Sequence, residues 1–256
     1  MTKDEYLAKL NEAFHDFVFY PADHHYEYKG KRVGISVTRL IEEYTQPFDA
    51  ETVAQRVANK SGKSVQEVLD KWQQKNDWSC KKGSIGHEYA QHLWRGEVEF
   101  VYETIKDKNK KNDLEKIFTQ AEHFCRDYLH KLAPIADEFV VGSFEYDVAS
   151  AIDELFVNKA TGDLVLVDYK TNSDIHKNEK YAGKMKAPLS SLKDTTLNHY
   201  AIQLSIYKYL VEKYAGVKVD EMFIVYMSEN IENYEIIDVP YLEKEVETIL
   251  EWRKWE

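Results

Sequence analysis

The chain has 256 residues, of which 43% are hydrophobic and 31% are charged, a composition that suits one large domain and excludes global disorder. It has no apolar run near the roughly 20 residues of a membrane-spanning helix, and its acidic, amphipathic N-terminus is unlike a signal peptide, so we expect a cytoplasmic protein. A formal charge of −11 argues against binding nucleic acid through a uniformly basic surface, but it is compatible with a local positive groove or with divalent cations.

The N-terminal half is predicted to be mainly helical. Apolar residues at helical spacing indicate an amphipathic helix over residues 3–19. Residues 24–36 alternate around Lys29, Gly30 and Lys31, which predicts a short hairpin with a glycine in its turn. The pattern from Thr38 to Leu132 is helical in several pieces, except for a lysine-rich stretch at 106–116 that we expect to form a loop.

The second half changes to strand patterns. Three segments rich in β-branched and aromatic residues predict consecutive antiparallel strands at Glu138–Tyr146, Val148–Asn158 and Leu164–Tyr169. A polar connection over 171–195 then leads to a helix at about 196–215. Two more strands and a C-terminal helix follow, at Glu221–Tyr226, Tyr234–Val239 and from Tyr241. We therefore expect one α/β or α+β domain over 1–256, with a helical elaboration over 1–135 and a sheet core over 136–256.

Asp153, Asp168 and Lys170 form the first candidate site. Residues two apart on a strand point to the same face, so Asp168 and Lys170 project together. If the two strands pair across the intervening turn, Asp153 comes beside Asp168. Two carboxylates with an ammonium suit a hard cation such as Mg²⁺ or Mn²⁺ and the cleavage of a phosphodiester. The alternative is an Asp–Lys pair that only decorates a strand surface.

Two helices add polar candidates. His87 follows a glycine-bearing turn and offers an imidazole as a metal ligand, although a histidine on a helix is more often structural. Gln203 and Tyr207 are four residues apart and share one helical face, where the alternative for Tyr207 is a place in the apolar stripe.

In this order, these motifs resemble the RecB-like branch of the PD-(D/E)xK nuclease superfamily, and they are similar to phage-type exonucleases. The resemblance covers about residues 33–226. It is carried by Gly83 with His87, by Asp153, by the run from Asp168 to Thr171, and by Gln203 with Tyr207. It implies a restriction-endonuclease-like fold, a central mixed sheet flanked by helices.

The resemblance also implies roles for single residues. His87, Asp153 and Asp168 would bind Mg²⁺ or Mn²⁺ with the main-chain carbonyl of Tyr169, and Lys170 would be the catalytic lysine. Gln203 and Tyr207 would contact the substrate. The chain has only two isolated cysteines, Cys80 and Cys125, so no iron–sulfur cluster is expected.

Lysines are the candidates for holding DNA, either single-stranded or as duplex ends. The connection over 171–195 leaves the catalytic strand directly and supplies Lys177, Lys180, Lys184 and Lys186. Further lysines at 81–82 and 106–116 would add to a positive funnel if they converge on the site, and would otherwise be solvated surface.

The sequence thus predicts a metal-dependent deoxyribonuclease, most readily an exonuclease that works in recombination, repair or phage replication, with proteins of those processes as partners. Two alternatives remain open. One is a structure-specific endonuclease on the same fold, and the other is a DNA-binding module that has lost its activity.

Overall fold

The computed structural model describes residues 1–177, 179 and 182–254. A mixed sheet forms its centre, with the strands in the order β4 (Ile35–Ser36), β6 (Val148–Asn158), β7 (Leu164–Lys170), β8 (Val219–Tyr226) and β9 (Glu235–Asp238). The long strand β5 (Leu132–Ser143) pairs with β6. Neighbours in this sheet run antiparallel, except that β4 is parallel to β6 and β7 is parallel to β8.

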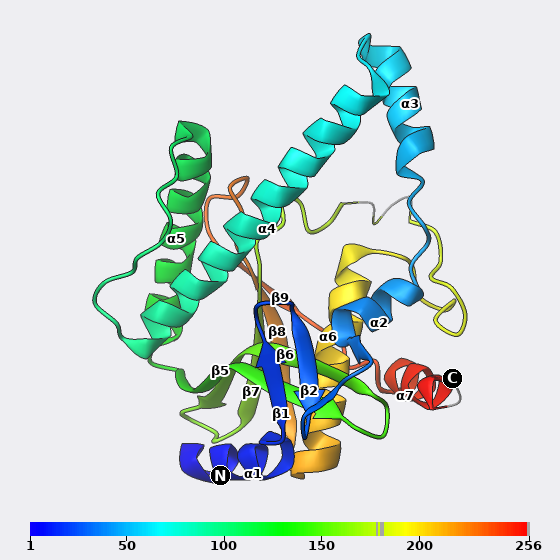
Figure 1. The fold of residues 1–256 in the computed structure, drawn as a ribbon. Helices are drawn as coiled ribbons and strands as arrows, with labels where there is room; N and C mark the ends of the chain where they lie inside the picture. Colours follow the sequence, from blue (N-terminus) through cyan, green and yellow to red (C-terminus); the bar gives the residue numbers. More distant parts are fainter. Residues whose placement is uncertain (178, 180–181, 255–256) are drawn as a thin grey trace.

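Helices cover both faces of the sheet (Figure 1). Long helices α4 (Val65–Arg95) and α5 (Lys108–Tyr128) pack on one face, where Trp94 and Phe124 meet Phe156 and Tyr169. Helices α1 (Lys3–Phe14), α2 (Val37–Glu43), α6 (Thr196–Leu210) and α7 (Glu243–Arg253) bury their apolar residues in the core on the other face. The prediction of a mixed sheet flanked by helices, with a helical N-terminal half, is confirmed.

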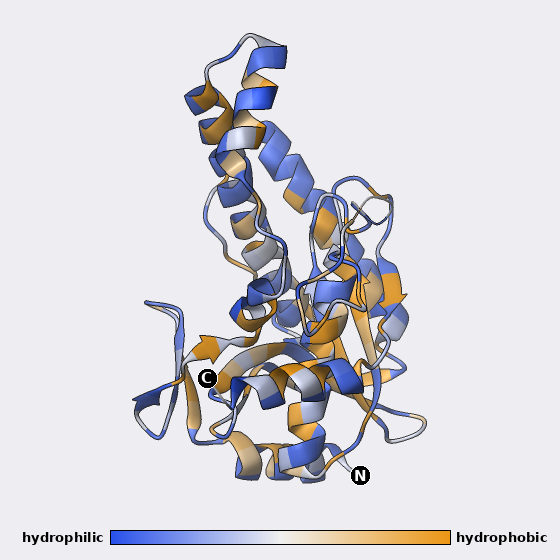
Figure 2. Ribbon diagram, turned by 90° about the vertical axis from the view of Figure 1, so that its right-hand side faces the viewer, coloured by the Kyte–Doolittle hydropathy of each residue, from blue (hydrophilic) through white to orange (hydrophobic). Residues whose placement is uncertain are grey.

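The helices α3 (Ala50–Ser61) and α4 form a hairpin whose tip rises away from the sheet (Figures 1 and 2). A small core of Ala54, Ala58 and Val68 joins the two helices. Ser64 and Glu67 form a capping box that starts α4, and Gly96 ends the helix in the left-handed conformation. In the part of the chain that the structure describes, none of the helices is long and apolar enough to cross a membrane.

Three predicted boundaries were wrong. The strand expected at Glu138–Tyr146 spans Leu132–Ser143 instead, because residues 144–147 form the turn into β6. The first helix ends at Phe14, because Phe17 instead begins strand β1 (Phe17–Tyr20), which pairs with β2 (His25–Tyr28). The lysine-rich stretch at 106–116 is mostly the start of α5, not a loop. Its first turn has no apolar residue to reveal a helix, but the Asp107 carboxylate caps it by accepting from the backbone of Asn109 and Lys110.

The predicted hairpin is present. Strands β2 and β3 (Lys31–Arg32) pair antiparallel, with Tyr28 opposite Lys31. Lys29 and Gly30 both have positive φ, at 50° and 74°, as a tight two-residue turn requires. A short π-helical turn, Val211–Ala215, completes the helix expected at 196–215.

Candidate active site

The two predicted carboxylates, Asp153 and Asp168, lie where strands β6 and β7 separate. Strand β5 occupies one edge of β6, so β4 and β7 share the other edge. On that edge β4 reaches only to Ala149, and β7 starts to pair at Glu154. Asp153 therefore lies where β6 and β7 separate. Extending the register of Glu154 opposite Val167 by one step puts Asp153 opposite Asp168.

The Asp153 side chain binds the backbone of β7 at the point where the backbone pairing of β6 and β7 ends. Its Oδ2 atom accepts a hydrogen bond of 2.9 Å from the backbone N–H of Tyr169. Asp168 is 1% exposed, and burial, opposed by Lys170 and reinforced by the charge of Asp153, raises its pKa to about 6. Burial also raises the pKa of Asp153. Two close, desolvated carboxylates are a site that a cation would stabilise.

Lys170 faces the same side as Asp168, as its strand position predicts. Its Nζ atom lies 2.5 Å from Asp168 Oδ2 and 4.5 Å from the centre of the Tyr200 ring. Tyr200 is held in turn by a 2.8 Å hydrogen bond to Asn172. Burial alone would lower the pKa of Lys170, but the charges of Asp168 and Asp153 outweigh it and raise that pKa. The ammonium is therefore charged at neutral pH.

His87 reaches this place from α4. Its Nδ1 atom lies 3.3 Å from Asp153 Oδ2. Burial, followed by the charge of Lys170, lowers the pKa of His87 to about 4, so the imidazole is neutral at pH 7 and has a lone pair for a metal. Gly86 permits α4 to lie close to α5 and to the end of β7, because a Cβ at this position would lie 3.0 Å from Ile117 and 3.3 Å from Thr171.

Gln91 and Glu138 belong to the same cluster, and the sequence reasoning missed them. Gln91 donates from Nε2 to Glu138 Oε1 at 2.9 Å and to the carbonyl of Asp153 at 3.3 Å. Partial desolvation, followed by the charge of Asp153, raises the pKa of Glu138, although the residue as a whole is exposed to solvent. Gln91 follows His87 by four residues on one helix, a spacing that could have revealed it.

The two candidate residues on α6, Gln203 and Tyr207, differ in burial. Tyr207 is 1% exposed, and its hydroxyl shares hydrogen bonds with Ser150 at 2.9 Å and with Gln203 at 2.7 Å. Gln203 is partly exposed. This arrangement fits Tyr207 as a residue that orients Gln203 better than as a direct substrate contact.

The predicted lysines are spread over several places. Lys186 donates from Nζ to the carbonyl of Glu43 at the end of α2, and Lys184 pairs through its backbone with Lys193. Lys177 lies in a cleft beside α4 that is described below. Lys180 lies outside the described residues. The expectation that the four lysines act together on DNA stays a prediction.

Lys81 and Lys82 do not add to a positive funnel, because each is paired with a carboxylate. Lys81 pairs with Glu103. The buried Lys82 lies 2.5 Å from Glu229 Oε2, and Glu229 also accepts a 2.9 Å hydrogen bond from Ser173. Ser173 follows β7 by three residues and Glu229 follows β8, so this buried pair ties α4, and with it His87, to the ends of both strands.

The chemistry of the predicted ligands fits a hard divalent cation. The Oδ1 atom of Asp168 is buried without a hydrogen-bond partner among the described residues, the His87 imidazole is neutral, and Asp153 adds a second carboxylate. Across the described residues, however, no three His, Cys, Asp or Glu side chains are already arranged to hold a metal ion. In this structure the Asp168 carboxylate is paired with Lys170 instead.

Glu154, the neighbour of Asp153, provides a prediction about stability. It is 2% exposed, and burial followed by the charge of Asp153 raises its pKa from 4.5 to about 9. Because the folded state prefers the protonated form, this group stabilises the fold below pH 4.5 and loses that contribution as the pH rises towards 9. At pH 7 we expect Glu154→Gln to increase the free energy of unfolding by about 2–3 kcal/mol.

Urea denaturation at pH 4.5 and pH 7 checks this prediction. The gain should nearly vanish at the lower pH. The matched control is Glu247→Gln on α7, an exposed carboxylate that should change little at either pH. If Glu154→Gln and the unmodified protein are equally stable at pH 7, burial does not raise the pKa of Glu154 and the prediction is wrong.

No family model matches the chain, and no curated protein matches it. Among solved structures, the chain is similar to the crystal structure of SSO0001, with 14% sequence identity and a TM-score of 0.31 over 99% of this chain and 85% of that chain. A likeness this weak carries no argument, so the case for the site rests on its own residues.

Proposed function

We propose that the protein is a divalent-cation-dependent deoxyribonuclease of the PD-(D/E)xK type, and specifically an exonuclease that acts on DNA in recombination, repair or phage replication. One observation carries the proposal. Asp153 and Asp168 meet where two strands separate, with the Lys170 ammonium 2.5 Å from one carboxylate and the neutral His87 imidazole 3.3 Å from the other. The order of the motifs along the chain supports the same assignment.

In this proposal Asp153, Asp168 and His87 hold Mg²⁺ or Mn²⁺, together with the main-chain carbonyl of Tyr169. The cation would supply positive charge to the scissile phosphate and lower the pKa of a bound water. Lys170 remains protonated, so its role is to donate hydrogen bonds and to stabilise negative charge, not to accept a proton. Gln91 and Tyr207 position Glu138 and Gln203 around these groups.

Incubation with linear single-stranded and duplex DNA, with EDTA, Mg²⁺ or Mn²⁺, tests the proposal. We expect degradation only with a divalent cation, and release of mononucleotides or short products from the ends. If purified, folded protein leaves both substrates intact at every metal concentration tried, it is not a deoxyribonuclease.

Circular single-stranded DNA distinguishes the alternatives. An exonuclease cannot begin on a circle, so cleavage of the circle would assign a structure-specific endonuclease. A module without activity would bind DNA while showing no binding of Mn²⁺ by calorimetry. The intact set of Asp153, Asp168 and Lys170 favours the enzyme.

A further inference from the structure

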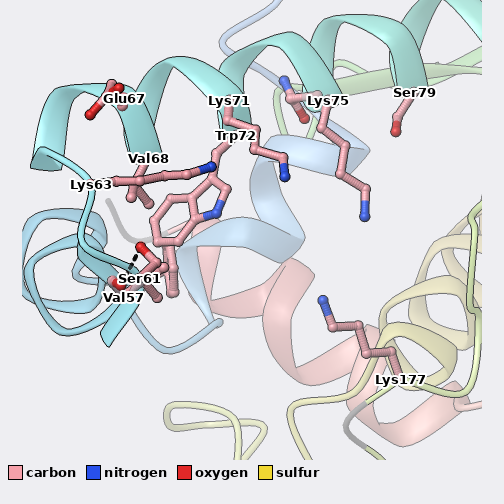
Figure 3. A pocket seen from close by; sticks show the side chains of 12 residues that line it. Val57, Ser61, Lys63, Glu67, Val68, Lys71, Trp72, Lys75, Ser79 and Lys177 are labelled. Atoms are coloured by element: carbon pink, nitrogen blue, oxygen red, sulfur yellow. Dashed lines mark hydrogen bonds between the residues drawn. The ribbon is translucent and has the colours of Figure 1, made fainter. Parts of the chain in front are cut away.

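A cleft of about 790 Å³ lies beside the projecting half of α4 (Figure 3). None of the candidate metal ligands is among its lining residues. The α3–α4 hairpin forms one wall with Lys63, Lys71 and Lys75, and the connection after β7 contributes Lys177 from the opposite side. Two aromatic residues, Phe48 and Trp72, also line the cleft. A cavity of this volume accommodates a group as large as a nucleotide.

The cleft is positively charged on a protein of net charge −11. None of its four lysines forms an ion pair with a residue in the described ranges. The acid among the lining residues, Glu67, keeps its negative charge, and its carboxylate accepts hydrogen bonds from the backbone and hydroxyl of Ser64 in the capping box. The lysines of the lining outnumber this acid four to one. Four exposed ammonium groups around one hollow favour a ligand with several negative charges.

The aromatic residues narrow the class of ligand. The Phe48 side chain is 70% exposed, and its ring centre lies 6.0 Å from that of Trp72. Trp72 also packs against the small core of the hairpin, so its burial there is partly structural. Phe48 has no such role at its exposed face. Open aromatic faces next to lysines are typical of surfaces on which unpaired bases stack while the phosphates contact ammonium groups.

The helix α4 connects this cleft to the candidate active site. Trp72, Lys75, Ser79, Gly83 and His87 follow one another at intervals of three or four residues, so they lie along one side of the helix. Lys75 and His87 are twelve positions apart, about 18 Å at 1.5 Å per residue. That length corresponds to about five nucleotides of a stacked strand at 3.4 Å each.

We propose that this cleft binds the single-stranded part of the DNA substrate, about five nucleotides from the catalytic carboxylates. The identity of the ligand as DNA rests on the proposed function, whereas the polyanionic, base-stacking character of the site rests on the cleft itself. The lysines hold the phosphates, and Trp72 with Phe48 stacks on a base.

Fluorescence anisotropy of a labelled twenty-nucleotide oligothymidine in EDTA tests this without any catalysis. We expect Lys71→Ala with Lys75→Ala to weaken binding about tenfold at low salt and to reduce the slope of log K against log salt by about 1.4. Trp72→Leu should weaken binding at least about fivefold with an unchanged slope. A duplex of the same length should bind the unmodified protein less tightly and should not respond to Trp72→Leu.

Matched controls separate the cleft from general effects. Lys9→Ala with Lys244→Ala removes the same charge from exposed positions on α1 and α7, and Trp252→Leu removes a tryptophan that is 50% exposed. Thermal melts confirm that each variant is folded. If the double-lysine variants in the cleft and in the control weaken binding equally, or if duplex binds as tightly as the single strand and with the same dependence on the cleft, the proposal is wrong.

A length series links the cleft to the active site. With Mg²⁺, the cleft variant should digest a twenty-nucleotide strand about tenfold more slowly at low substrate concentration, but should match the unmodified protein on strands of four nucleotides, which cannot reach the cleft. A protein that binds the oligothymidine through the cleft but never cleaves it would overturn the proposed function and leave the binding site standing. Equal losses on long and short strands would contradict the placement.

Discussion

Asp168→Asn should abolish cation-dependent cleavage of DNA, lowering the rate by at least about 10³-fold, or about 4 kcal/mol of transition-state stabilisation. The substitution keeps the size of the side chain and removes the charge at the point where β6 and β7 separate. It also removes the partner of the Lys170 ammonium, so the cation and the lysine are both affected. Initial rates on linear single-stranded DNA with Mg²⁺ measure the loss.

The matched control for this prediction is Asp163→Asn, at the turn before β7 and thus at the opposite end of the same strand. It should retain near-normal activity. Asp168→Asn protein that is folded by circular dichroism and still digests DNA within a factor of ten of the unmodified protein would remove Asp168 from the mechanism.

Lys82→Met should lower the free energy of unfolding by about 3–5 kcal/mol, because it leaves the half-buried Glu229 carboxylate without its ammonium partner. Burial alone would raise the pKa of Glu229, but the hydrogen bond and charge of Lys82, together with the other hydrogen bonds to this carboxylate, outweigh burial and lower that pKa. The pair joins α4 to the ends of β7 and β8, so we also expect slower cleavage at temperatures where the variant is still folded.

Urea denaturation of single and double variants tests the role of this pair. Glu229→Leu with Lys82→Met replaces both charges by apolar groups and should recover most of the lost stability, since neither charge is then left unpaired. Lys81→Met, next in sequence but with an exposed ion pair, should change stability by less than about 1 kcal/mol. If Lys82→Met behaves like Lys81→Met, the buried pair does not stabilise the position of α4.

The sheet was predictable because its strands have clear patterns. The β-branched runs at 148–158 and 164–170 and the turn between them indicate an antiparallel pair whichever residues pack above them. The start of α5 was not predictable in this way, because its first turn is all polar and depends on the cap from Asp107. The strand that begins at Phe17 was not predictable either, because the spacing of Phe17 from Phe14 is helical although the two rings pack across a change from helix to strand.

The candidate site was predictable where two residues share one element. The spacing of Asp168 and Lys170 places them together on any strand, and four residues bring Gln203 to Tyr207 on any helix. Contacts between distant segments were not predictable. Glu138 meets Gln91 only because β5 lies against α4 in the fold. The sequence also cannot show that Tyr207 is buried while Gln203 is not. The cleft beside the α3–α4 hairpin was likewise not predictable, because it depends on how the connection after β7 brings Lys177 near α4.

Anomalous diffraction from crystals soaked in Mn²⁺ tests the central claim most directly. We expect a manganese peak bound by Asp153, Asp168 and His87, with the Lys170 ammonium displaced from Asp168, and no such peak in Asp168→Asn crystals treated in the same way. Crystals that take up Mn²⁺ elsewhere, or that show no peak at these carboxylates at a concentration that supports DNA cleavage, would contradict the assignment of this site as the metal-dependent nuclease centre.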